Sequence, residues 1–151
     1  MTETLRYKVT IAASPERVWE ALTTPEGSRA TLYGCLIESS FEVGSRVEFV
    51  SYGAGGERTV QVYGDIEAFE PPRRFAYIQH PGAVHNEQHV ETMCRMTHVL
   101  TPHEDGTELE LTLDQWSDEN PAYEHAKSAY PESDYLKGIK AYAESPKPQA
   151  P

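Results

Sequence analysis

The sequence predicts an α+β domain: a curved antiparallel sheet of about seven strands wrapped around a long C-terminal helix, with one or two short helices after the first strand. Three observations predict it. An alternating segment near the N-terminus is followed by a helical one, six further segments have strand periodicity, and helical spacing returns near the end. Strands joined by short turns form an antiparallel meander, and its twist leaves a concave face for the last helix to cover.

The N-terminal segments are the first strand and the short helices. Apolar and polar residues alternate strictly over residues 5–11, which is typical of a half-buried strand. Ser14 is a good N-cap and Pro15 suits the first helical position, so a helix should begin here. Pro25 should stop that helix, and a second short helix is expected over residues 28–33.

Six strands should follow. Glycine- and proline-containing turns separate the apolar segments, and Asp105-Gly106 is the strongest hairpin signal among them. The expected strands are residues 36–41, 46–52, 59–69, 73–80, 90–100 and 107–116.

The C-terminal segment is helical in its periodicity from Ala122 to Tyr142. Pro131 should kink this helix, interrupt it or divide it in two. Residues 145–151 hold three prolines and little apolar surface, so they are expected to form a flexible tail. The sequence therefore predicts one domain over residues 1–144.

Charge and composition limit the classes of partner and the location. With 13 Lys and Arg against 24 Asp and Glu, the net charge of −11 disfavours nucleic-acid binding. No apolar run is long enough to predict membrane insertion. Cys35 and Cys94 lack the spacing of a metal site. The sequence allows one disulfide between them, but two free thiols are expected, which indicates a reducing, cytoplasmic setting. No metal and no cofactor are predicted.

Four segments together resemble the SRPBCC, or START-like, superfamily, and more narrowly its branch named for the activator of the heat-shock-protein-ninety ATPase. They are residues 13–26 (ASPERVWEALTTPE), 41–45 (FEVGS), 64–75 (GDIEAFEPPRRF) and 104–112 (EDGTELELT). The chain departs from that branch at residues 30–34 (ATLYG), where tryptophans are common. It departs again at residues 130–133 (YPES), where a glycine-tryptophan pair commonly opens the final helix.

The resemblance implies a helix-grip fold with a cavity between the sheet and the C-terminal helix. Relatives bind lipids, sterols, polyketides or other hydrophobic molecules, and some are cyclases or hydrolases. The expected function is therefore binding of a small hydrophobic ligand in that cavity. The alternatives are an enzyme that uses the same cavity and a co-chaperone, which only the branch name suggests. Assembly into a homodimer stays open.

Strand alternation and helical spacing select the residues that should face the cavity. His98 is the most specific candidate, because it lies on an otherwise apolar strand face and imidazole titrates near neutrality. It would orient a polar ligand group or act as an acid–base, or else it is a core histidine bonded to Thr, Tyr or backbone. The full set would line a cavity or simply fill a dry core: Trp19, Phe75, Tyr77, Cys94, Met96, His98, Leu111, Tyr123, Tyr130, Leu136 and Ile139.

A cluster of metal-ligating residue types lies between strands. His80, His85, Glu87 and His89 fall within ten residues, but their spacing is not that of a zinc-protease helix. Pro81-Gly82 indicates a loop instead, which we expect over the cavity mouth, where it would gate entry. No catalytic residue is assigned from the sequence.

Overall fold

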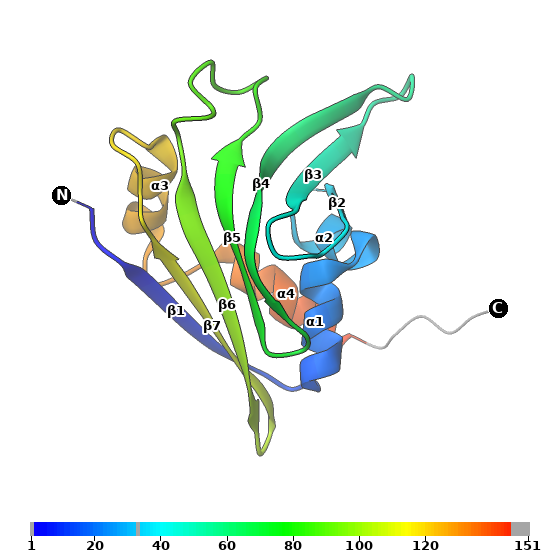
Figure 1. Ribbon diagram of the computed structural model, residues 1–151. Helices are drawn as coiled ribbons and strands as arrows, with labels where there is room; N and C mark the ends of the chain where they lie inside the picture. The colour runs from blue at the N-terminus through cyan, green and yellow to red at the C-terminus, as the bar shows by residue number, and fades with distance from the viewer. Residues whose placement is uncertain (1, 33, 146–151) are drawn as a thin grey trace.

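Seven antiparallel strands form one curved sheet in the computed structural model, which describes residues 2–32 and 34–145 (Figure 1). The strands lie in the order β1-β7-β6-β5-β4-β3-β2, so the first strand joins the far end of a meander. Their bounds are β1 Leu5–Ile11, β2 Leu36–Ser39, β3 Arg46–Tyr52, β4 Arg58–Glu70, β5 Arg74–Pro81, β6 Cys94–His103 and β7 Gly106–Asp114. The predicted tail beyond Ser145 and the predicted helical residue Tyr33 lie outside the described residues.

Two short helices, α1 Pro15–Thr23 and α2 Pro25–Thr31, follow β1. Ser14 caps α1 as expected, because its hydroxyl accepts a hydrogen bond from the Arg17 amide at 3.2 Å. The second helix begins three residues earlier than predicted. Thr24 ends α1 and also caps α2 by accepting from the Gly27 amide at 3.0 Å, so Pro25 opens a helix as well as stopping one.

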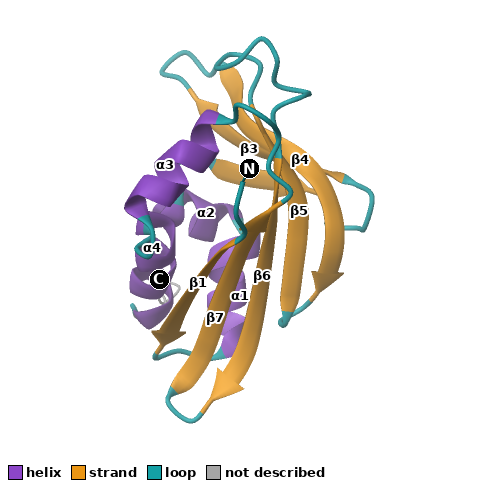
Figure 2. Ribbon diagram, turned by 90° about the vertical axis from the view of Figure 1, so that its left-hand side faces the viewer, coloured by secondary structure: helices purple, strands orange, loops and turns teal. Residues whose placement is uncertain are grey.

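The C-terminal helical segment is divided into α3 Pro121–Ala129 and α4 Asp134–Glu144. The predicted interruption at Pro131 is confirmed, and Ser133 caps the new helix by accepting from the Leu136 amide at 3.3 Å. Helix α4 contacts α1, α2 and β1 across the concave side of the sheet, whereas α3 lies nearer the opposite end of the strands (Figure 2). The sheet is therefore gripped around two helices placed end to end.

Several strand ends differ from the prediction by one to four residues, and the structure explains the start of β6 and the end of β7. Strand β6 begins at Cys94, because residues 90–93 turn away from the sheet and leave Val90 exposed. Strand β7 ends at Asp114, because Gln115 adopts a positive φ of 54°, which strand geometry does not allow.

The hydrophobic core fills the half of the concave face that lies against α1 and α4. Trp19 of α1 packs its ring against Phe69 at 5.4 Å and Phe75 at 6.2 Å. Ile139 of α4 is fully buried, as is Leu109 of β7. Buried side chains fill this half of the concave face, and the pocket described below lies toward the other end of the sheet.

Candidate functional site

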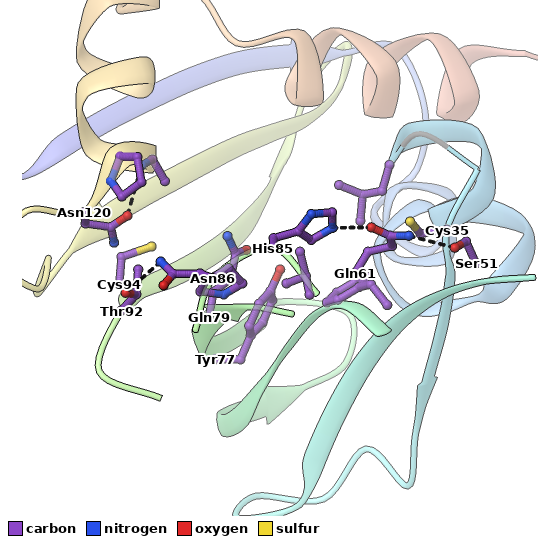
Figure 3. Close-up of a pocket in the computed structure, with 16 residues that line it drawn as sticks. Cys35, Ser51, Gln61, Tyr77, Gln79, His85, Asn86, Thr92, Cys94 and Asn120 are labelled. Carbon is purple, nitrogen blue, oxygen red and sulfur yellow. Dashed lines mark hydrogen bonds between the residues drawn. The ribbon is translucent and has the colours of Figure 1, made fainter. Parts of the chain in front are cut away.

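A pocket of about 700 Å³ lies at the end of the concave face away from the core (Figure 3). Its walls come from strands β3 to β6, from Leu32 and Cys35 between α2 and β2, from the loop of residues 82–93 and from the start of α3. The lining residues are Leu32, Cys35, Phe49, Ser51, Gln61, Val62, Tyr77, Gln79, Pro81, His85, Asn86, Thr92, Cys94, Asn120, Pro121 and Ala122.

Strand alternation explains why these strand residues meet. Tyr77, Gln79 and Pro81 occupy every second position of β5 and therefore share its inner face. Val62 of β4 pairs with Pro81, and Cys94 of β6 pairs with Gln79, so the neighbouring strands extend the same surface on both sides.

The pocket walls are mainly apolar. The rings of Phe49 and Tyr77 pack at 5.8 Å, and Leu32, Cys35 and Val62 add aliphatic or thiol surface. Burial raises the pKa of the Cys94 thiol to about 12, with the charge of Asp114 as a smaller cause, so this thiol stays protonated. Such surface favours an apolar guest over water.

Several polar lining groups bond to one another. The Gln61 amide donates to Ser51 at 2.9 Å, and its carbonyl oxygen accepts from Nε2 of His85. Asn86 donates to the Thr92 hydroxyl at 3.3 Å. The bond between His85 and Gln61 ties the loop of residues 82–93 to β4 at the pocket (Figure 3).

Asn120 has both halves of its side chain occupied. It donates to the Met93 carbonyl at 3.0 Å, and its oxygen caps α3 by accepting from the Ala122 amide at 3.0 Å. The start of α3 is thereby fixed to Met93, the residue before β6, and it closes one end of the pocket.

Two polar lining groups differ from the rest, because within residues 2–32 and 34–145 neither has a hydrogen-bond partner. They are the hydroxyl of Tyr77 and the carboxamide of Gln79. Tyr77 is only 2% exposed, and Figure 3 shows its hydroxyl pointing into the pocket. Burial, more than its neighbours Tyr135 and Cys94, raises the pKa of this hydroxyl well above its usual range, so it stays protonated and can both donate and accept.

The histidines at positions 80, 85 and 89, for which no metal site was predicted, hold the loop of residues 82–93 in place. Nδ1 of His80 donates to the carbonyl oxygens of His89 and Thr92, each at 3.0 Å. Nδ1 of His89 and the Tyr63 hydroxyl are 2.6 Å apart. The loop is thus fixed to Gln61 and Tyr63 of β4 and to His80 of β5. Its residues His85, Asn86 and Thr92 reach the pocket.

Two of the predicted cavity residues, Tyr77 and Cys94, line the pocket. The others lie elsewhere, because α1 and α4 fill the half of the concave face toward which their strands and helices point. Tyr130 is 45% exposed, with its ring 5.2 Å from Tyr7, and Tyr123 packs on Trp116 at 5.1 Å. The remaining seven are part of, or packed against, the dry core: Trp19, Phe75, Met96, His98, Leu111, Leu136 and Ile139.

His98 is a hydrogen-bonded core histidine. Its Nδ1 lies 3.0 Å from the Phe75 carbonyl, which can only accept, so Nδ1 carries the proton and Nε2 accepts from the Tyr135 hydroxyl at 2.9 Å. Complete burial lowers the pKa of His98 to about 4, against the smaller opposing effect of the Phe75 bond. The ring is therefore neutral at pH 7, with both nitrogens occupied.

Replacing Tyr135 with Phe should lower the free energy of unfolding by about 1–3 kcal/mol, because it leaves Nε2 of His98 buried without a donor. Urea denaturation at pH 7 measures the change. Tyr52→Phe is the control: its hydroxyl bonds Glu38 at 2.8 Å on the surface, and its loss should change stability by less than about 0.5 kcal/mol. Equal effects of the two substitutions would contradict the buried bond.

Sequence reasoning selected Tyr77 and placed His85 in a loop over the cavity mouth, but it did not select the other polar lining residues, which are Ser51, Gln61, Gln79, Asn86, Thr92 and Asn120. One signal was available for Gln79, which follows Tyr77 by two positions on the same strand and so shares its face. Asn120 precedes Pro121, a sequence typical of a helix start, which indicates α3 but not the pocket beside it. No sequence pattern indicates that His85 and Gln61 meet, since the loop between them has no period.

Comparison with known proteins places the chain in a family. The family model described as "Activator of Hsp90 ATPase homolog 1-like protein" matches residues 12–144. No curated protein matches the sequence. No helix within residues 2–32 and 34–145 is long and apolar enough to cross a bilayer.

Solved structures share the fold over nearly the whole chain. A protein from Mesorhizobium loti is 23% identical with a TM-score of 0.69, covering 93% of this chain and 96% of its own. One from Rhodobacter sphaeroides is 27% identical with a TM-score of 0.66, and the match covers 93% of this chain and 89% of its own. The Aha1 dimer from Colwellia psychrerythraea is 18% identical with a TM-score of 0.66, covering 94% and 96%. The helix-grip fold of the START-like superfamily is thus confirmed, and the chain belongs to the Activator of Hsp90 ATPase homolog 1-like family.

Proposed function

We propose that the pocket under the loop of residues 82–93 binds a small, mostly apolar molecule. The observation that supports this most strongly is the pocket itself: about 700 Å³ of space, with apolar walls and a few polar groups. Small-molecule sites usually have this size and this mixture. A domain that needed only stability would fill the space with side chains, as it does at the other end of the sheet.

The proposed site differs in place from the cavity expected along the C-terminal helix. Ile139 and Leu136 of α4 are buried in the core and leave no room there. The pocket adjoins Asn120 and Ala122 at the start of α3 instead. The break between α3 and α4 therefore separates a helix that builds the core from one that borders the proposed ligand.

The enzyme alternative receives no support from the described residues. That hypothesis needs His98 together with a tyrosine such as Tyr77 or Tyr130 as acid–base groups. Tyr77 lines the pocket, but His98 is neutral at pH 7, has both nitrogens bonded and does not line it, so the two do not act together there. The co-chaperone alternative rests on the family description, and a shared fold does not carry a function with it. Binding is the function that we carry forward.

Filling the pocket tests the proposal. Ala122→Trp places an indole at the pocket wall and should weaken binding of the uncharged dye Nile red by about tenfold or more. Ala122 is exposed, so the substitution should leave folding intact. Fluorescence titration measures the affinity, and native mass spectrometry of the purified protein shows whether a ligand is retained from the cell.

Ala129→Trp is the matched control, because Ala129 is exposed on the same helix and does not line the pocket. It should bind Nile red as the original protein does. If both variants bind equally well, or if Nile red does not bind saturably at all, the proposed pocket is not a ligand site.

Assembly as a homodimer stays a prediction. Its support is the Colwellia psychrerythraea relative, whose structure is that of a dimer. Light scattering during size-exclusion chromatography would measure the mass against the 17.0 kDa of one chain.

A further inference from the structure

We infer that the pocket selects an uncharged ligand whose carbonyl or hydroxyl oxygen pairs with the hydroxyl of Tyr77. This inference rests on the proposed binding function and names the class of ligand. It follows from two features of the lining: an unpaired hydroxyl that points inward and a lack of charged side chains.

The hydroxyl of Tyr77 needs a partner that the described part of the chain does not supply. The side chain is 2% exposed, yet its oxygen bonds to none of residues 2–32 and 34–145. By contrast, the nearby buried Tyr135 hydroxyl bonds His98 at 2.9 Å. Its oxygen faces the pocket space, so in the free protein water is its partner, and an oxygen on a guest molecule can take that place.

Gln79 adds a second anchor on the same face. It lies two residues along β5 from Tyr77 and lines the pocket, and its side-chain carboxamide has no hydrogen-bond partner among the described residues. A carboxamide offers both donors and acceptors. The two groups together suit a ligand with two neutral polar atoms on one side and apolar surface elsewhere.

The lining excludes ionised ligands. Its sixteen described residues include no Asp, Glu, Lys or Arg, and the Nε2 of His85 is held by the side-chain oxygen of Gln61, so no permanently charged side chain there compensates a carboxylate, phosphate or ammonium group that leaves water. The thiols of Cys35 and Cys94 have raised pKa values because of burial and remain neutral. The chain's net charge of −11 opposes anions in addition. Fatty acids and phosphorylated lipids are therefore the wrong class.

Four matched probes test the inference by displacement of Nile red. Benzophenone supplies a neutral carbonyl, diphenylmethane has the same rings without oxygen, and 4-benzoylbenzoate carries a carboxylate whose methyl ester restores neutrality at similar size. The ester should bind at least about tenfold more tightly than the acid. Tyr77→Phe should weaken benzophenone about tenfold and leave diphenylmethane unchanged. Tyr135→Phe removes a buried hydroxyl outside the pocket lining. It should change neither the affinity ratio of ester to acid nor that of benzophenone to diphenylmethane.

The outcomes separate the two proposals. If Nile red binds but the acid competes as well as its ester, or Tyr77→Phe weakens both hydrocarbon and ketone equally, the ligand class is wrong and the binding site stands. If neither Nile red nor benzophenone binds the original protein saturably, both proposals are overturned.

Discussion

Acidification from pH 7 to pH 4 should lower the free energy of unfolding by about 3 kcal/mol through His98 alone. The folded-state pKa of His98 is about 4, whereas the unfolded chain has the ordinary value of 6.5. Between these values the unfolded state holds more protons, so stability falls as the pH falls. A difference of about 2.5 pKa units corresponds to the stated loss.

Urea denaturation at closely spaced pH values measures this loss, and His98→Gln should remove most of the slope between pH 6.5 and 4. Glu38, Glu48 and Glu144 have lowered pKa values because of bonds to Arg58 or Lys140, so their contributions disappear only below the ordinary value of 4.5. These three carboxylates are present in both the original protein and the His98→Gln variant, so they do not affect the comparison. Parallel pH profiles for the two proteins would show that His98 does not titrate as a buried group.

Gly27→Ala should cost about 3 kcal/mol of unfolding free energy, the upper part of the usual range for overpacking. A Cβ at this position would lie 2.2 Å from the Glu20 carbonyl oxygen and 2.6 Å from the Ala21 Cα. Both obstacles are backbone atoms of α1, so no side chain can rotate away. The helices α1 and α2 would have to separate.

Gly138→Ala provides the opposite case within the same fold. Its Cβ would lie 3.5 Å from the nearest atom of Thr31, which is ordinary contact, and the residue is inside α4. Alanine there should stabilise the protein by about 0.5–1 kcal/mol. Thermal and urea unfolding of both variants measure the contrast, and a neutral Gly27→Ala would contradict the close contact of α1 with α2.

The fold was predictable because its signals are local and periodic. Alternation over residues 5–11 and the cap at Ser14 each depend on a few neighbouring residues, and both elements appear where expected. The errors occurred where tertiary contacts decide. Residues 90–93 carry apolar character but leave the sheet, because Thr92 and His89 bond His80 instead of extending a strand.

The candidate site was less predictable because periodicity gives the face of a residue and not its depth along the sheet. Tyr77 and Phe75 share the inner face of β5, yet only Tyr77 reaches the pocket. The difference depends on which side chains arrive from elsewhere. Trp19 packs on Phe75 at 6.2 Å, whereas Tyr77 lies two residues farther along the strand and lines the pocket.

The core end and the pocket end of the sheet also differ in how many substitutions they can accept. Packing of α1 and α4 on the sheet supplies the burial that holds the domain together, so substitutions there lower stability. The loop of residues 82–93 and the start of α3 contribute little to that burial. Substitutions in the loop of residues 82–93 and at the start of α3 can therefore alter the pocket lining while the packing of α1 and α4 on the sheet stays the same.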